Sequence, residues 1–330
     1  MKKYFLLGLL LLLIPHTAHL QTNVEEQISI DFSPRYPGPN ELVSISIESF
    51  QVDLDKSKID WVINGSIIES GFGLKNFRFT TGDLGEETNI TINIEKQNGQ
   101  KLQKNYSINP GEVDLYYEAD TYTPPFYKGK SEYTYQSRLK LIALPNFVDN
   151  LGNSVPANEV VYKWKIDGEV DASNSGTGRD IYYYESNLIS GPIQVTLEAS
   201  PVNSNQVGRV IKTISPTEPI ILIYEKNPIY GTIFEQNIKS GFNVDREEIE
   251  LVAIPYNFSG NILNVGDFEW RLNGNEIKNF FSNNIIFRRI DDSASTNLVS
   301  IQIENPSKIL QLQKYSFDLN FGNSQKEFNF

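Results

Sequence analysis

The feature that most constrains the fold is a short phrase that the chain contains three times. It reads IDWVINGSI at 59–67, YKWKIDGEV at 162–170 and FEWRLNGNE at 268–276. In each copy a tryptophan is followed by one variable residue, an aliphatic residue, Asn or Asp, and then Gly. The three copies contain all three tryptophans of the 330-residue chain, so a single structural explanation must cover them.

Apolar and polar residues alternate around each tryptophan. In the first copy Ile59, Trp61 and Ile63 are apolar and every second residue, and a period of two is typical of a β-strand with one buried face. The other copies repeat this with Tyr162, Trp164 and Ile166, and with Phe268, Trp270 and Leu272. We therefore expect Trp61, Trp164 and Trp270 to form the centres of structural cores.

Each tryptophan strand is followed by a two-residue turn signal. The pairs are Asn64-Gly65, Asp167-Gly168 and Asn273-Gly274. A two-residue hairpin turn needs positive φ at both central positions, and Asn, Asp and Gly tolerate that region best. The repeated phrase thus predicts a strand with an inward tryptophan, closed by a tight hairpin.

The tryptophans are separated by 103 and 106 residues, which is the size of one small β-sandwich domain. The segments INPGEVDLYYE (108–118) and ISPTEPIILIYE (214–225) also match each other at this spacing. Other stretches alternate in the same way, and turn residues separate them. The sequence predicts an all-β chain with three sandwich domains, at residues 24–112, 113–217 and 218–330. The linkers are short and contain proline, so we expect a semi-rigid, elongated array.

The first twenty residues have the pattern of a secretory signal. Lys2 and Lys3 precede the apolar run FLLGLLLLLI at 5–14, which is too short to cross a bilayer. We expect residues 1–20 to be a signal peptide and the protein to be exported, so that it lies outside the cell, on the cell surface or in the periplasm. Membrane contact is expected only through this segment, and only if it stays uncleaved.

Removing that segment would leave little catalytic chemistry. Both histidines, His16 and His19, and the single methionine lie within it, and the chain contains no cysteine. Zinc sites of His and Cys, haem, iron–sulfur clusters and Ser-His-Asp triads are therefore excluded for the remaining chain. The net charge of −12 also makes nucleic acid a poor partner.

The strand with tryptophan followed by Asn/Asp-Gly, repeated in domains of about 100 residues, resembles the immunoglobulin-like and PKD-like domains of secreted bacterial proteins. PKD-type domains have Gly-Asp-Gly at this turn, whereas this chain has plain Asn/Asp-Gly. The resemblance is therefore to the broad Ig-like class, and the cysteine pair of antibody domains is missing. It implies a fold and a surface location but does not imply a ligand.

Carboxylate pairs are the remaining candidates for chemistry or calcium binding. They are Asp53/Asp55, Glu86/Glu87, Glu247/Glu248 and Asp291/Asp292. Glycosidic catalysis needs two carboxyl groups that face each other across a cleft, which small sandwiches rarely build. Oxygen ligands for Ca²⁺ are plentiful, but no ligand loop is recognisable. We expect solvated acidic loops, no catalytic residues and no required cofactor, with calcium as the alternative.

Tyrosine is concentrated in two stretches, at 115–135 and 181–186. Seven tyrosines are candidates for contacts with a ligand, because a tyrosine combines an apolar ring face with a polar tip. They are Tyr116, Tyr117, Tyr122, Tyr127, Tyr182, Tyr183 and Tyr184. Consecutive tyrosines of a strand cannot all be buried, so either Tyr183 or its two neighbours must face outward. Packing at a domain junction is the structural explanation for the same pattern.

These observations predict a non-catalytic, exported protein that acts as a structural spacer or an adhesive component of a cell-envelope assembly. Its partners would be other envelope proteins or surface glycans. The alternative is a carbohydrate-binding protein that uses the tyrosine-rich surfaces. A glycosidase based on carboxylates is the third hypothesis.

Overall fold

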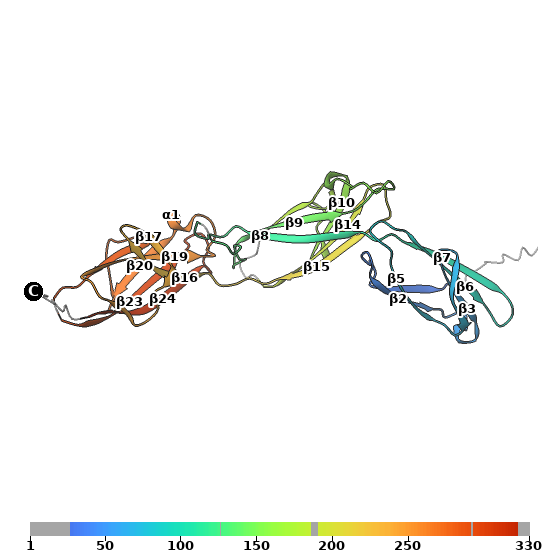
Figure 1. Ribbon diagram of the computed structural model, residues 1–330, viewed down its shortest axis with the longest axis horizontal. Helices are drawn as coiled ribbons and strands as arrows, with labels where there is room; N and C mark the ends of the chain where they lie inside the picture. The colour runs from blue at the N-terminus through green and yellow to red at the C-terminus, as the bar shows by residue number, and fades with distance from the viewer. Residues whose placement is uncertain (1–26, 126, 186–190, 292, 323–330) are drawn as a thin grey trace, which may run out of the picture.

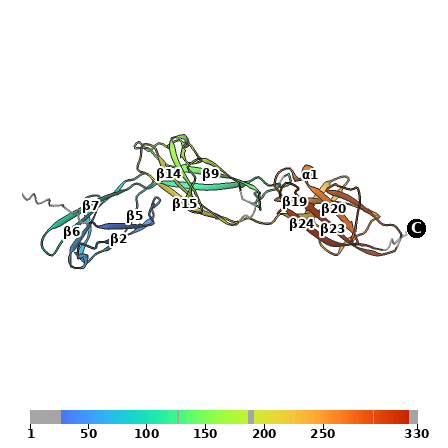
Figure 2. The same cartoon turned by 180° about the vertical axis from the view of Figure 1, so that it is seen from behind.

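Three β-sandwiches follow one another along the long axis of the molecule, and the first is tilted away from the line of the other two (Figure 1). The view from behind shows the same order (Figure 2). This computed structural model describes residues 27–125, 127–185, 191–291 and 293–322. The predicted signal peptide, residues 1–20, lies outside them. Within these ranges no helix has the length and apolar character needed to cross a membrane.

The first domain packs a three-stranded sheet against a four-stranded sheet. The sheet orders are β1-β2-β5 and β4-β3-β6-β7, and all pairings are antiparallel. The elements are β1 (Ser29–Ser33), β2 (Leu42–Glu48), η1 (Leu54–Lys56), β3 (Lys58–Ile63), β4 (Ser66–Phe72), β5 (Asn76–Thr80), β6 (Thr88–Glu95) and β7 (Lys101–Ile108).

The second domain repeats this arrangement. Its sheets have the orders β13-β9-β8 and β11-β10-β14-β15, and the short β12 also pairs with β10. The elements are β8 (Glu112–Ala119), β9 (Arg138–Asn146), η2 (Ala157–Glu159), β10 (Val160–Ile166), β11 (Glu169–Val170), β12 (Gly176–Thr177), β13 (Ile181–Glu185), β14 (Ile193–Pro201) and β15 (Gly208–Ile214).

The third domain adds one strand to each sheet, giving β17-β16-β19-β22 and β18-β24-β23-β20-β21. The added β17 forms a hairpin with β16, and the added β18 runs parallel to β24. The elements are β16 (Ile220–Asn227), β17 (Gly231–Asn237), β18 (Phe242–Val244), β19 (Glu248–Tyr256), α1 (Ile262–Val265), β20 (Asp267–Leu272), β21 (Asn275–Glu276), β22 (Asn284–Arg288), β23 (Ser295–Glu304) and β24 (Leu312–Phe321).

The shared order of strands is that of the immunoglobulin-like sandwich, in which two antiparallel sheets enclose one core. The predicted class, an all-β chain of tandem Ig-like sandwiches, is confirmed by these sheets. Each domain has its own cluster of buried apolar residues. The clusters extend from Ile28 to Ile94, from Val113 to Ile214 and from Ile221 to Phe321.

The structure places Trp61, Trp164 and Trp270 in three different clusters, each with no exposed surface. Every indole N–H donates to a backbone carbonyl just before the last strand of the opposite sheet. The acceptors are Leu74 O at 2.9 Å, Arg179 O at 2.8 Å and Ser282 O at 2.9 Å. The indole thus fills the core and joins the two sheets, while its single polar atom remains paired.

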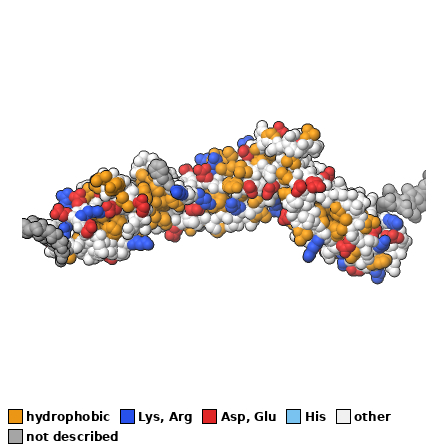
Figure 3. All heavy atoms as spheres, in the orientation of Figure 1, with side chains coloured by type: hydrophobic (Ala, Val, Ile, Leu, Met, Phe, Trp, Pro, Cys, Tyr) orange, Lys and Arg blue, Asp and Glu red, His pale blue; other side chains and the backbone are white. Residues whose placement is uncertain are grey.

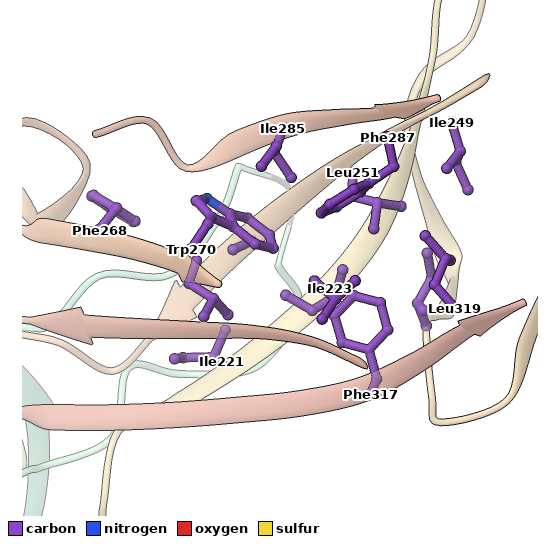
Figure 4. Packing of buried hydrophobic residues seen from close by; sticks show 14 of the residues in the cluster. Ile221, Ile223, Ile249, Leu251, Phe268, Trp270, Ile285, Phe287, Phe317 and Leu319 are labelled. Atoms are coloured by element: carbon purple, nitrogen blue, oxygen red, sulfur yellow. The ribbon is translucent and has the colours of Figure 1, made fainter. Parts of the chain in front are cut away.

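An aromatic ring from the opposite sheet contacts each indole. Trp61 stacks on Phe77 with ring centroids 5.1 Å apart, and Trp164 stacks on Tyr182 at 5.6 Å. In the third domain Phe287 meets Trp270 edge-on at 6.4 Å, among aliphatic side chains from both sheets (Figure 4). In every domain the tryptophan of one sheet therefore contacts an aromatic ring of the opposite sheet at the centre of the core.

The three turn pairs lie where the phrase predicted tight turns. Asn64 and Gly65 have φ values of 47° and 81°, and the corresponding pairs in the other domains are also positive. The Asn64 side chain has a second role, because its Oδ1 accepts a hydrogen bond from the backbone N–H of Asn89 at 2.9 Å. Asp167 and Asn273 accept equivalent bonds from the next long strand. Asn or Asp is needed here for this bond as well as for its positive φ.

The junction between the first two domains is short and closely packed. The N–H of Gly85, in the first domain, donates to Pro110 O in the linker at 3.0 Å. A Cβ on Gly85 would overlap Val148 of the second domain. The Val148 backbone is itself held by the buried Gln206, whose Nε2 donates to Val148 O at 2.5 Å. Glycine is thus required for this close approach.

Candidate functional site

The seven candidate tyrosines do not form one surface. Tyr182 is buried against Trp164, and its hydroxyl hydrogen-bonds Asp171. Burial, together with Asp171, raises the pKa of Tyr182 to about 12. Tyr182 therefore offers no ring face to a ligand, which corrects its inclusion among the ligand-contacting residues. Tyr184 and Tyr117 are half-buried against the same core.

Tyr122 and Tyr127 lie on the long connection between β8 and β9, which reaches the third domain. The backbone N–H of Tyr122 donates to Phe258 O at 2.7 Å, and that of Asn257 donates to Tyr122 O at 2.8 Å. The Tyr122 side chain packs against the core of the third domain, and the Tyr127 ring meets Tyr256 edge-on at 5.5 Å. These two tyrosines contribute to the domain junction.

A buried polar network completes that junction. Gln311 of the third domain has no exposed surface, and its Nε2 donates to Tyr135 O of the second domain at 2.6 Å. Its Oε1 accepts from the N–H of Ser259 at 2.8 Å. Thr134, also fully buried, donates from Oγ1 to Asn257 O at 3.0 Å. Because these groups lack access to water, their bonds fix the position of one domain on the other.

The outward faces of the three corresponding sheets differ in chemistry. In the first domain this face is polar, with Ser44 beside Arg78 and Ser46 beside Asn76. In the third domain it is apolar, and a cluster built on Tyr224, Val252, Ile254 and Tyr256 is covered by Tyr122, Tyr127 and Phe234. In the second domain it is mixed, with one apolar row between rows that carry charged side chains, and it stays exposed.

That exposed face of β8, β9 and β13 holds the two remaining candidates. Tyr116, Ile142 and Ile181 form one row across the strands. The next row contains Tyr183, Lys140 and Glu118, and Tyr116 and Tyr183 are 53% and 49% exposed. Hydrophobic side chains gather over this part of the middle domain in Figure 3. We name the surface of Tyr116, Ile142, Ile181 and Tyr183 the tyrosine platform.

The platform leads into a cleft of about 400 Å³ between the second and third domains. The second domain contributes three charged side chains, Asp120, Arg138 and Glu185, and the third contributes Asn305 and Lys308. Clefts of this size at domain interfaces are common places for small ligands. Two carboxylates and two cations line the cleft, so its formal charge is balanced.

Arg138 connects the platform with the cleft. Its guanidinium lies over the Tyr183 ring, 4.4 Å from the centroid, and its Nε is 3.6 Å from Oε1 of Glu185. Both partners of that ion pair are largely exposed, so the pair adds little stability. The charged end of Arg138 is thus available beside the exposed ring.

The predicted carboxylate pairs form local surface contacts. Asp53 pairs with Lys56 at 2.9 Å, Asp55 pairs with Lys75 at 2.9 Å, and Glu248 pairs with Arg288. Asp292 lies outside the described residues. Within the described parts of the chain, no three or more Asp, Glu, His or Cys side chains are grouped as a metal site would need.

Sequence reasoning missed Arg138, Asp120, Glu185 and the residues from the third domain. A signal for the orientation of the tyrosine run was present, because GFGLKNFRF (71–79) aligns with GTGRDIYYY (176–184). That alignment places Tyr183 opposite the polar Arg78, and Tyr182 opposite the core residue Phe77. No local signal indicated the cleft, since its two walls are more than 70 residues apart in the sequence.

Comparisons with known proteins give fold-level likeness alone. No family model matches the chain, and no curated protein matches it. Fibronectin(III)-like modules of CbhA from Clostridium thermocellum are 13% identical over 57% of this chain and 94% of theirs, with a TM-score of 0.28. The central fibronectin-III array of RIM-binding protein is 11% identical over 91% of this chain and 94% of its own, with a TM-score of 0.28.

A third solved structure is SGBP-B of the Bacteroides ovatus mixed-linkage glucan utilization locus, in complex with a mixed-linkage heptasaccharide. It is 12% identical over 89% of this chain and 70% of its own, with a TM-score of 0.22. At such TM-scores the fold assignment rests on the sheets of this chain itself. Those sheets make the chain a tandem array of Ig-like β-sandwiches.

Proposed function

We propose that this chain is an exported, non-catalytic spacer or adhesive component of a cell-envelope assembly, in which a stiff array of domains carries a binding surface away from an anchor. The observation that carries the proposal is the buried network around Gln311, Thr134 and Asn257. A loop that served only as a flexible tether would have no need of fully buried bonds between its two domains.

The size of one sandwich gives the approximate length of the array. One sandwich is roughly 40 Å long, because strands of up to about ten residues rise about 3.4 Å per residue, so three in line reach on the order of 100 Å. Partners would be other envelope proteins or surface glycans, and no cofactor takes part.

Small-angle X-ray scattering on the chain without residues 1–20 tests the stiffness. A stiff array gives a maximum dimension on the order of 100 Å and one narrow distribution of shapes. A compact particle, or a broad distribution typical of freely jointed domains, would contradict the spacer. Hydrolysis of a glycan or peptide by the same sample would contradict the non-catalytic part.

A further inference from the structure

We infer that the tyrosine platform and the adjoining cleft form one binding site for a neutral oligosaccharide. The inference goes beyond the spacer role, since a stiff array needs no ligand of its own. It starts from the contrast between the outer faces of the second and third domains. The face of the third domain is covered by Tyr122 and Tyr127, whereas the platform on the second domain leaves Tyr116 and Tyr183 half exposed.

The chemistry of the two parts is complementary to a sugar chain. A pyranose ring has an apolar face that packs on an aromatic ring, and a rim of hydroxyl groups that donate and accept hydrogen bonds. Tyr116 and Tyr183 supply the rings. Asp120 and Glu185 supply acceptors, and Arg138 and Lys308 supply donors, all along one cleft.

The charges indicate a neutral ligand. The cleft holds two carboxylates and two cations, so it offers no excess of positive charge to a polyanion. The whole chain carries −12, which repels acidic polysaccharides at long range. An extended acidic peptide is disfavoured for the same reason.

The spacing indicates an oligomer. Tyr116 and Tyr183 lie two strands apart and one row apart. From a strand spacing of about 4.8 Å and a rise of about 3.4 Å per residue, their Cα atoms are roughly 12 Å apart. One sugar ring cannot contact both tyrosines, and a chain that begins on Tyr116 and passes Tyr183 arrives at the cleft.

The test is titration calorimetry of the chain without residues 1–20 against neutral β- and α-linked oligosaccharides of increasing length, chosen after a glycan array. We expect binding that appears with chain length, that monosaccharides do not inhibit and that changes little with salt. Tyr183→Ala should weaken it about tenfold or more, as expected for an aromatic anchor. Arg138→Ala should weaken it as well.

Tyr230→Ala is the matched control, because Tyr230 is 79% exposed on the third domain, far from the platform. It should bind like the unaltered chain. The inference is overturned if no neutral oligosaccharide binds to chain with native circular dichroism, if Tyr183→Ala binds undiminished, or if the site takes acidic polymers or peptides instead. Scattering from the same sample keeps this result separate from the spacer proposal, which can hold without any ligand.

Discussion

Replacing Gln311 with Leu should release the third domain from the second while both sandwiches stay folded. Leucine has a similar size but no polar atoms. The substitution leaves the N–H of Ser259 and the carbonyl of Tyr135 without their bonds of 2.8 Å and 2.6 Å. Each unpaired buried group costs about 1–3 kcal/mol, so the closed junction loses roughly 2–6 kcal/mol.

The molecule can avoid most of that cost by opening the junction, because water then pairs with both groups. We therefore expect bending between the second and third domains more than unfolding. Scattering should show a broader distribution of dimensions, and thermal denaturation should show the third domain melting separately, at least about 5 °C lower.

The control is Gln313→Leu, two residues further along the chain and inside β24. Gln313 makes one long, exposed contact, from its Nε2 to Glu218 at 3.4 Å, so its loss should change stability by no more than about 0.5 kcal/mol. If Gln311→Leu and Gln313→Leu give the same scattering curve and the same melting profile as the unaltered chain, the buried network does not hold the junction.

Three further substitutions test the cores and the other junction. Trp61→Ala should cost the first domain about 3–5 kcal/mol, so limited proteolysis should cut there first and spare the other two domains. Hydrogen bonds from the neighbouring serine and asparagine side chains lower the pKa of Asp171, so its stabilisation is present above about pH 4 and is lost as pH falls through its folded pKa. The stability gap between the chain and Asp171→Asn, measured by urea unfolding, should therefore be full at pH 5 and shrink by pH 2.5. Gly85→Ala should disturb the first junction by overlapping Val148, whereas Gly99→Ala, with a similar positive φ but open space, should cost about 1 kcal/mol of strain alone and leave the scattering unchanged.

The elements that the sequence predicts well depend on local rules. The strand around Trp270 follows from a period of two, and the turn at Asn273-Gly274 follows from the need for positive φ. Both rules act over fewer than about ten residues. One copy of the phrase is therefore enough to predict the strand and the turn, and the three copies support the same prediction. The bond from Asn273 to the N–H of Leu298 was not foreseen, because its partner is 25 residues away.

The junction and the cleft could not be read from the sequence, for a physical reason. Gln311 and Tyr135 are 176 residues apart, and nothing in the local pattern around either residue distinguishes a buried amide from an exposed one. The same limit applies to Lys308 and Arg138, which line one cleft only because the junction is closed. Alternation predicts which residues share a face, but it does not predict which face another domain covers.

The cores and the outer faces of the sheets have different roles, and this difference explains where the proposed binding surface lies. Each tryptophan is paired within its own domain, because the acceptors of the Trp61, Trp164 and Trp270 indole N–H groups belong to the same sandwich. The outer face of the corresponding sheet can therefore differ among the three domains. It is polar in the first, exposed in the second and covered in the third, while the sandwich beneath it keeps the same arrangement. Tyr183 is not among the residues that pack against the second-domain core, so its truncation should leave stability nearly unchanged. A loss of ligand binding in Tyr183→Ala would then report on the surface itself, which is why this face offers a cleaner functional test than any buried position in the chain.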